Sequence, residues 1–281
     1  IPVKTIAMVT PNILHATIVP VDSKITSLKD FKGANPPATI GIVTGSSAEF
    51  YFQMAATVHG LEMGKDVILK NMPIGEQMAL PKGIDAVVPW DAGASVILEE
   101  RKNGKMIDSI YPYNMYEGNF VVLQDLVDNV PDVVQALSDA YAEALLWSRF
   151  NPEGAVKLLQ EDPSLKNFSK EILTQQTRLY NALYKPTFIY PHGKFWGEAN
   201  EPIFNWLFQQ KRIQRPLKAA DFEQSVDARF MEKTFAKLGW AVPKTPPFLP
   251  ADWKGSLAQM PYPAHLTPVN RKEPQVFPDK G

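Results

Sequence analysis

Strand-like and helix-like segments alternate along the first 125 residues, and this alternation constrains the fold more than any other feature of the chain. Two short apolar segments come first, Val3–Val9 and Ala16–Val21. Strand-like and helix-like segments then follow in turn: Thr39–Val43, Phe50–Val58, Asp66–Lys70, Gly75–Leu80, Ile84–Pro89, Ala92–Lys102 and Asn119–Leu123. Strands that alternate with helices form mostly parallel sheets covered by helices. The pattern therefore predicts an α/β protein.

The second half of the chain is predicted to be helical, and its last part differs in character. An apolar stripe runs along Pro131–Phe150, and its proline suits the first turn of a helix. Further helices are predicted at Glu153–Gln160, Ser169–Leu183, Gly197–Lys211 and Ala228–Leu238. Residues 241–281 include nine prolines and show no periodicity. We therefore expect an extended C-terminal arm over 241–281.

The charge balance and the absence of cysteine exclude several classes of protein. The 281 residues carry a net charge of −1, from 29 basic and 30 acidic side chains. Because nucleic-acid-binding and membrane-surface proteins usually have a basic excess, neither class is favoured. No apolar run approaches the ~20 residues that cross a bilayer. A chain without cysteine has no disulfide, zinc–thiolate site or cysteine nucleophile, and no cofactor is expected.

The first candidate site is the turn Thr44-Gly45-Ser46-Ser47, where a predicted strand ends and a helix begins. Unpaired amide groups and a partial positive charge at a helix N-terminus attract anions. In open parallel sheets, ligands bind at the carboxyl ends of strands, which is where this turn is predicted to lie. The alternative is an ordinary helix cap, for which Ser46 or Ser47 is suited.

The second candidate is Trp90-Asp91, directly after the predicted strand Ile84–Pro89. A tryptophan in a crevice stacks on a flat solute or covers an apolar one. The aspartate accepts hydrogen bonds from an amine or caps the next helix. A core tryptophan and a capping aspartate are the alternatives to a binding role.

The third candidate is the polar and aromatic stretch before the predicted strand Asn119–Leu123. Its possible solute contacts are Asn114, Tyr116, Glu117 and Asn119. A polar turn closed by Gly118 would explain the same residues. The sequence alone leaves both explanations open.

Motifs of several enzyme classes are absent. The chain contains no P-loop, no G-x-G-x-x-G, no G-x-S-x-G and no H-E-x-x-H. Its four histidines are scattered, at His15, His59, His192 and His265. Isolated histidines are more often structural or superficial than catalytic, so we predict no catalytic residues and no metal site.

The order of several segments resembles the nitrate, sulfonate, taurine and thiamine-precursor binding proteins of ABC importers. The first segment, Ser23–Gly33 (SKITSLKDFKG), is similar to the family pattern "ds-I-sl-kDLkGk". The others follow at the family's spacing: Thr39–Ser47, Gly60-Leu61 with Asp66-Val67, Ala79–Asp91 and Val130–Trp147. The resemblance covers about residues 1–240.

This resemblance implies a two-lobed type II periplasmic-binding fold with a ligand cleft between the lobes. Residues 1–20 and 111–240 would form lobe I, residues 21–110 lobe II, and 241–281 the arm. The family normally begins with about two βα units before the segment that starts here at Ile1, so lobe I would lack these units. The implied protein is periplasmic and secreted, with its signal peptide outside this chain, and it is monomeric.

The family's ligand contacts fall on Gly45, Ser46 and Ser47, on Trp90, and on Glu117 and Asn119. The implied function is hinge closure on a small solute, followed by docking on a membrane permease. The solute would be a sulfonate, a carboxylate, a nitrate-like anion or an aminopyrimidine. Two alternatives share the fold: an enzyme similar to desulfinases or thiamine-pyrimidine synthases, and the effector domain of a transcription regulator.

Overall fold

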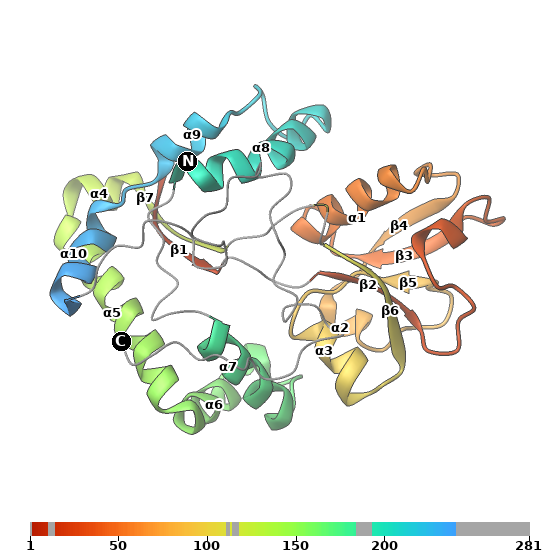
Figure 1. Ribbon diagram of the computed structural model, residues 1–281, viewed down its shortest axis with the longest axis horizontal. Helices are drawn as coiled ribbons and strands as arrows, with labels where there is room; N and C mark the ends of the chain where they lie inside the picture. The colour runs from red at the N-terminus through yellow and green to blue at the C-terminus, as the bar shows by residue number, and fades with distance from the viewer. Residues whose placement is uncertain (1, 11–14, 111–112, 114–117, 184–192, 240–281) are drawn as a thin grey trace, which may run out of the picture.

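The computed structural model describes residues 2–10, 15–110, 113, 118–183 and 193–239. Figure 1 shows two bodies side by side, one built on a five-stranded sheet and the other on a two-stranded sheet surrounded by helices. The arm predicted for 241–281 and the candidate site residues Asn114, Tyr116 and Glu117 lie outside the described residues.

The larger sheet contains five strands in the order β4-β3-β5-β2-β6. The strands are β2 (Ala16–Pro20), β3 (Ala38–Ile42), β4 (Val67–Asn71), β5 (Ala86–Val87) and β6 (Gly104–Ser109). β3 is parallel to β4 and β5, and β2 is antiparallel to β5 and β6. Only β2 therefore runs against the other four strands, which confirms the predicted mostly parallel sheet.

Apolar side chains cover both faces of this sheet, because successive strand residues point to opposite sides. One cluster holds Ala86 and Val88, and the other holds Val87. The elements around the sheet are η1 (Leu28–Phe31), α1 (Ser47–Val58), α2 (Ile74–Gln77), α3 (Gly93–Ser95) and η2 (Val96–Glu100). The first cluster includes Phe52 of α1, and the second includes Ile97 of η2.

The second body is a strand pair surrounded by helices. Strands β1 (Val3–Thr10) and β7 (Gly118–Leu123) are antiparallel. The helices are α4 (Gln124–Asn129), α5 (Pro131–Phe150), α6 (Pro152–Glu161), α7 (Lys170–Leu183), α8 (Gly193–Gln209), α9 (Ala219–Ser225) and α10 (Arg229–Leu238). α5 packs on α10, where the Ser138 and Thr234 hydroxyl groups are 2.9 Å apart. The predicted long helix Pro131–Phe150 is confirmed at both ends.

Among the strands and α-helices that the structure describes, three are not indicated by the sequence pattern: β6, α4 and α9. β6 lies at one edge of the sheet, and none of its residues is fully buried. Its sequence, GKMIDS, mixes charged and apolar residues, as an edge strand facing solvent allows. It therefore lacks the continuous apolar run by which the central strands were recognised.

The boundary between the predicted lobes changes at β2. The prediction assigned residues 1–20 to lobe I, but β2 is hydrogen-bonded between β5 and β6. A strand paired on both edges belongs to its sheet, so residues 16–20 go with residues 21–110. The other boundaries of the two lobes stay predictions.

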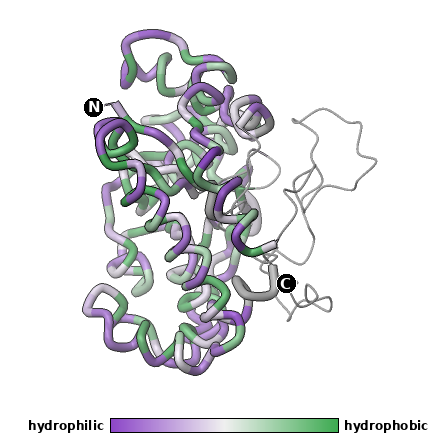
Figure 2. Tube along the Cα trace, turned by 90° about the vertical axis from the view of Figure 1, so that its left-hand side faces the viewer, coloured by the Kyte–Doolittle hydropathy of each residue, from purple (hydrophilic) through white to green (hydrophobic). Residues whose placement is uncertain are grey.

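Apolar and polar residues alternate along the helices in view in Figure 2, as the changing colour of the tube shows. This pattern is typical of amphipathic helices that bury one face. Among the described helices, none is both long and apolar enough to cross a membrane.

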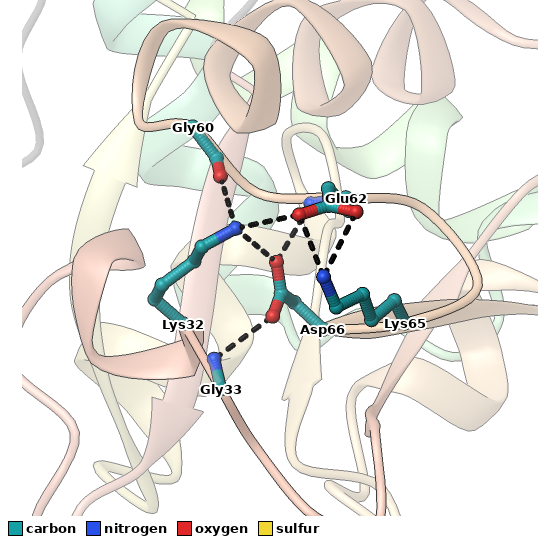
Figure 3. Close-up of polar contacts among 6 residues, drawn as sticks. All are labelled: Lys32, Gly33, Gly60, Glu62, Lys65 and Asp66. Atoms are coloured by element: carbon teal, nitrogen blue, oxygen red, sulfur yellow. Dashed lines mark hydrogen bonds and ion pairs between the residues drawn. The ribbon is translucent and has the colours of Figure 1, made fainter.

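A polar network fastens the loop before β3 to the loop before β4 (Figure 3). The Lys32 ammonium donates to the Gly60 carbonyl at 2.7 Å and to Asp66 at 2.9 Å. The Asp66 carboxylate also accepts from the backbone amides of Gly33 at 2.8 Å and Glu62 at 2.8 Å. Only 1% of the Asp66 side chain is exposed. The residues that carry the family resemblance here therefore have a structural role.

We expect Asp66→Asn to destabilise the protein at neutral pH. Hydrogen bonds from the Glu62 and Gly33 amides, followed by the Lys32 ammonium, lower the pKa of Asp66 from 3.8 to about 2. A carboxyl group whose folded pKa is depressed stabilises the fold above its unfolded pKa, and this contribution is lost as the pH falls towards 2. Melting temperatures measured from pH 7 to pH 2 should therefore converge for the two proteins at the acid end.

The matched control is Asp22→Asn, because Asp22 is exposed in the same body. This variant should melt within a degree or two of the wild type at every pH. A constant gap between Asp66→Asn and the wild type down to pH 2 would show that the charge of Asp66 contributes nothing.

Candidate functional site

The parallel strands β3, β4 and β5 end at the same edge of the larger sheet, which we call the carboxyl edge. The turn Thr44–Ser47 follows β3, and Trp90 and Asp91 follow β5. Asn71, the last residue of β4, accepts a hydrogen bond from the Thr44 amide at 3.0 Å. The two candidate sites of this part of the chain therefore lie along one edge.

The turn before α1 is built as a helix cap. Ser46 is the N-cap, and its hydroxyl accepts from the Glu49 amide at 3.4 Å and donates to the Val43 carbonyl at 2.6 Å. The Glu49 carboxylate accepts from the Gly45 amide at 2.5 Å. Ser46 thus has the capping role that was the alternative to binding. The first-turn amides of a helix have no partner within the helix, and amides in this position bind anions.

His15 joins the two candidate sites, although nothing in its local sequence marks it as a site residue. It directly precedes β2, and only 1% of its surface is exposed. Its Nε2 atom lies 2.8 Å from the Ser47 hydroxyl oxygen, and its ring centroid lies 6.2 Å from that of Trp90. Because β2 runs against β5, its first residue meets the carboxyl edge. The only signal in the sequence was this position at the start of a strand whose direction was unknown.

The Asp91 side chain takes part in a contact between helices. Its Oδ1 atom accepts from the Ser95 hydroxyl at 3.1 Å, and Ser95 accepts from Gln176 of α7 at 3.1 Å. Ser95 and Gln176 are both buried. Asp91 therefore helps α7 of the second body to dock on α3, whatever other contacts it makes.

Arg212 brings a positive charge to the turn from the second body. It lies in the connection between α8 and α9, and its Nη2 atom donates to both carboxylate oxygens of Glu49 at 3.1 Å. A Cβ atom added to Gly45 would lie 3.8 Å from Arg212 Nη1. The guanidinium offsets the charge of Glu49, so this acidic residue does not make the turn repel an anion. No sequence pattern connects residues 49 and 212.

Asn119 is on the other sheet, at the start of β7, where it is in register with Met8 of β1. Its Oδ1 atom is buried, and none of the described residues donates a hydrogen bond to it. A buried polar atom without a partner is uncommon in folded proteins. The contact between Asn119 and a solute stays a prediction.

A second polar cluster forms around Tyr113, which lies between β6 and β7 in the sequence. The Tyr113 hydroxyl is 2.9 Å from His59 Nε2 and donates to Asp108 at 3.4 Å. Burial raises the pKa of Asp108 above its usual range, and hydrogen bonds from Ser109 and Tyr113 partly oppose this shift. Burial also raises the pKa of Tyr113. The cluster anchors Tyr113 to the larger sheet and to the end of α1.

The structure thus brings together six of the candidate site residues at the carboxyl edge: Thr44, Gly45, Ser46, Ser47, Trp90 and Asp91. It adds His15, Glu49 and Arg212, which sequence reasoning did not single out. In the described part of the chain, no three side chains of histidine, aspartate or glutamate gather in a way that would hold a metal ion.

The fold is similar to solved structures of solute-binding proteins. The alkanesulfonate-binding protein SsuA from Xanthomonas axonopodis pv. citri, bound to MOPS, has a TM-score of 0.63 at 16% identity, covering 80% of this chain and 74% of that one. The periplasmic nitrate-binding protein NrtA from Synechocystis has a TM-score of 0.60 at 14% identity, covering 87% and 70%. The desulfurization enzyme DSZB has a TM-score of 0.59 at 17% identity, covering 84% and 80%.

These likenesses establish the periplasmic-binding fold, as the sequence analysis predicted. No curated protein sequence matches the chain. The sequence model of the family described as NMT1/THI5 like matches residues 1–155, which is more than half of the 281 residues. The predicted resemblance is therefore confirmed at the level of the family: the chain belongs to the NMT1/THI5-like family.

Proposed function

We propose that this protein is the extracytoplasmic solute-binding component of an ABC importer. The observation that carries the proposal is the carboxyl edge, where His15 lies between Ser47 of α1 and Trp90, and Arg212 of the second body pairs with Glu49 in the first turn of α1. The sulfonate- and nitrate-binding proteins with the same fold support it. The partner is a membrane permease, the location is the periplasm, and the protein acts as a monomer.

The proposed solute is a small organic anion. Helix N-terminal amides favour an anionic head group, and Arg212 offsets the charge of the buried Glu49. A sulfonate or carboxylate suits these groups better than an aminopyrimidine does, because backbone amides and a guanidinium donate hydrogen bonds and cannot accept them from an amine. The ring of Trp90 would cover a flat or apolar part of the solute.

The proposed mechanism is hinge closure. The lobes are residues 15–110 and residues 2–10 with 118–239, and the chain passes between them twice, from β1 to β2 and from β6 to β7. A solute that touches both lobes binds the closed arrangement more tightly and shifts the population towards it. The closed form then presents itself to the permease.

A thermal-shift screen tests this function. A panel of alkyl and aryl sulfonates, taurine, nitrate, aromatic carboxylates and aminopyrimidines is added to the purified protein. A specific ligand at 100 times its dissociation constant stabilises by about 2.7 kcal/mol, so a clear rise in melting temperature is expected with one class of anion. Ser47→Ala should weaken that response, since it removes the hydroxyl beside His15.

Thr57→Ala is the matched control, because Thr57 is an exposed hydroxyl residue on the same helix. It should leave the solute response unchanged. A folded protein whose melting temperature responds to no member of the panel would contradict the proposed function.

We further propose that binding occurs without turnover. The likeness to DSZB shows that an enzyme can have this fold, and a serine hydroxyl next to an imidazole is the kind of pair that activates nucleophiles. Incubation with aryl sulfinates and sulfonates, followed by assay for released sulfite, should detect none. Sulfite release that Ser47→Ala abolishes would instead establish an enzyme.

A further inference from the structure

Helix α8 of the second body contacts α1 through an aromatic side chain. The indole of Trp206 packs edge-on against Phe50, with ring centroids 5.3 Å apart, and donates to Gln53 at 3.0 Å. Trp206 is 7% exposed. The Arg212 guanidinium lies 4.8 Å from the centre of the same indole ring. The indole thus holds Arg212 in place beside α1.

Glu49 of α1 is the residue with which Arg212 forms an ion pair. Only 5% of Glu49 is exposed, and within its own helix it accepts from Gln53 at 2.9 Å. Arg212 is the one cation paired with it among the residues that the structure describes. A buried carboxylate that loses its cation is unfavourable. Moving α8 away from α1 would therefore leave the Glu49 charge uncompensated.

The contact of α7 with the larger sheet is of another kind. Ile172 of α7 is 3% exposed and belongs to the apolar cluster around Val87 and Ile97. Gln176 adds its hydrogen bond to Ser95. An apolar side chain seated in a core does not depend on a charge pair. The α8–α1 contact, by comparison, includes an ion pair, Arg212 with Glu49.

We propose that Arg212 is a positioning residue: its pair with Glu49 latches α8 to α1, holds the two lobes together, and thereby sets the affinity for solute. The proposal rests on the proposed function. Glu49 is also bonded to the Gly45 amide of the candidate anion turn. The latch and the binding turn thus share one carboxylate, so closing the latch orders the turn.

The latch affects affinity through the population of the closed state. The apparent dissociation constant rises as the fraction of the binding-competent conformation falls. Couplings between conformation and binding are commonly 5- to 150-fold. We expect Arg212→Ala to weaken solute binding by about tenfold or more. Arg212→Lys should restore part of this loss, because it keeps the charge but not the planar fork that stacks on Trp206.

The distance between two spin labels shows whether the latch is closed, and no solute is needed for this measurement. The chain has no cysteine, so Val58→Cys on α1 and Gln210→Cys after α8 label both bodies at exposed positions. Wild-type Arg212 should give one narrow distance distribution, and Arg212→Ala a broader and longer one. The matched control is Arg215→Ala, which removes an arginine of the same connection that pairs with Asp221 inside the second body. It should give the wild-type distribution.

The outcomes separate the latch from the proposed function. Unchanged label distances in Arg212→Ala overturn the latch, even where solute affinity falls, because Arg212 then touches the solute directly. If Arg212→Ala does not fold, the Glu49→Gln/Arg212→Gln pair leaves no stranded charge and is measured in its place. If no solute in the panel binds the wild type, the proposed function fails, and the label distances still decide the latch.

Discussion

Replacing Phe52 by alanine is expected to destabilise the protein by about 3–5 kcal/mol, which is the usual cost of truncating a buried phenylalanine. Phe52 is fully buried on the face of α1 that packs against the larger sheet. The change removes apolar area and leaves a cavity that rigid strands cannot fill. Urea unfolding followed by circular dichroism should show the loss as a lower midpoint.

Val58→Ala is the control for this measurement. Val58 is on the same helix but is 64% exposed, and surface substitutions usually change stability by less than about 0.5 kcal/mol. A loss below about 1 kcal/mol in Phe52→Ala would mean that α1 does not bury this face. The orientation of the binding turn at its N-terminus would then be wrong as well.

The sequence was informative about α1 because local and long-range requirements agree there. A buried β3, a serine cap and an apolar helix face each leave a mark in the sequence. The parallel order of β3, β4 and β5 then places the turn and Trp90 on one edge, since parallel strands end on the same side. Six of the candidate residues could be placed together by this reasoning alone.

The family motif around residues 23–33 indicated the correct fold, but the sequence did not show which contacts its residues make. Its Lys32 and Gly33 bind the Asp66 carboxylate, and Lys32 also binds the Gly60 carbonyl (Figure 3). All four belong to segments that carried the resemblance. They fix the frame of the sheet.

Residues that meet the site from distant segments could not be predicted. His15 reaches Ser47 only because β2 is antiparallel to β5, and strand direction is not encoded in an apolar segment of five residues. Arg212 reaches Glu49 across 163 positions of sequence. An exposed arginine in a connection has the same local pattern whether it faces solvent or another lobe.

The directions of the acidic side chains could not be predicted from the sequence either. Asp91 and Glu117 would repel an anion if they faced the cleft, and the sequence does not show which way they point; Glu117 lies outside the described residues. In the structure Asp91 is bonded to Ser95, and Glu49, which the sequence analysis did not discuss, is neutralised by Arg212. The electrostatics of the site therefore depend on partners from two other segments.

The second large effect is expected at Gly197, where α8 and α9 approach closely. A Cβ atom at Gly197 would lie 2.4 Å from the carbonyl oxygen of Ala219 and 3.0 Å from its Cα atom. These are backbone atoms, so they cannot rotate away as the end of a side chain can. Gly197→Val should destabilise by about 3 kcal/mol, the upper end of the usual cost of overpacking, as measured by urea unfolding.

Gly75→Val is the matched control, because a Cβ atom there meets nothing closer than the Asn167 amide at 4.0 Å. It should leave stability within about 0.5 kcal/mol of the wild type. The α8–α9 connection carries Arg212, so displacing α9 should also move the guanidinium away from Glu49. Gly197→Val should therefore broaden the spin-label distances as Arg212→Ala does. A destabilised variant with wild-type distances would show that the latch does not depend on how α9 packs on α8.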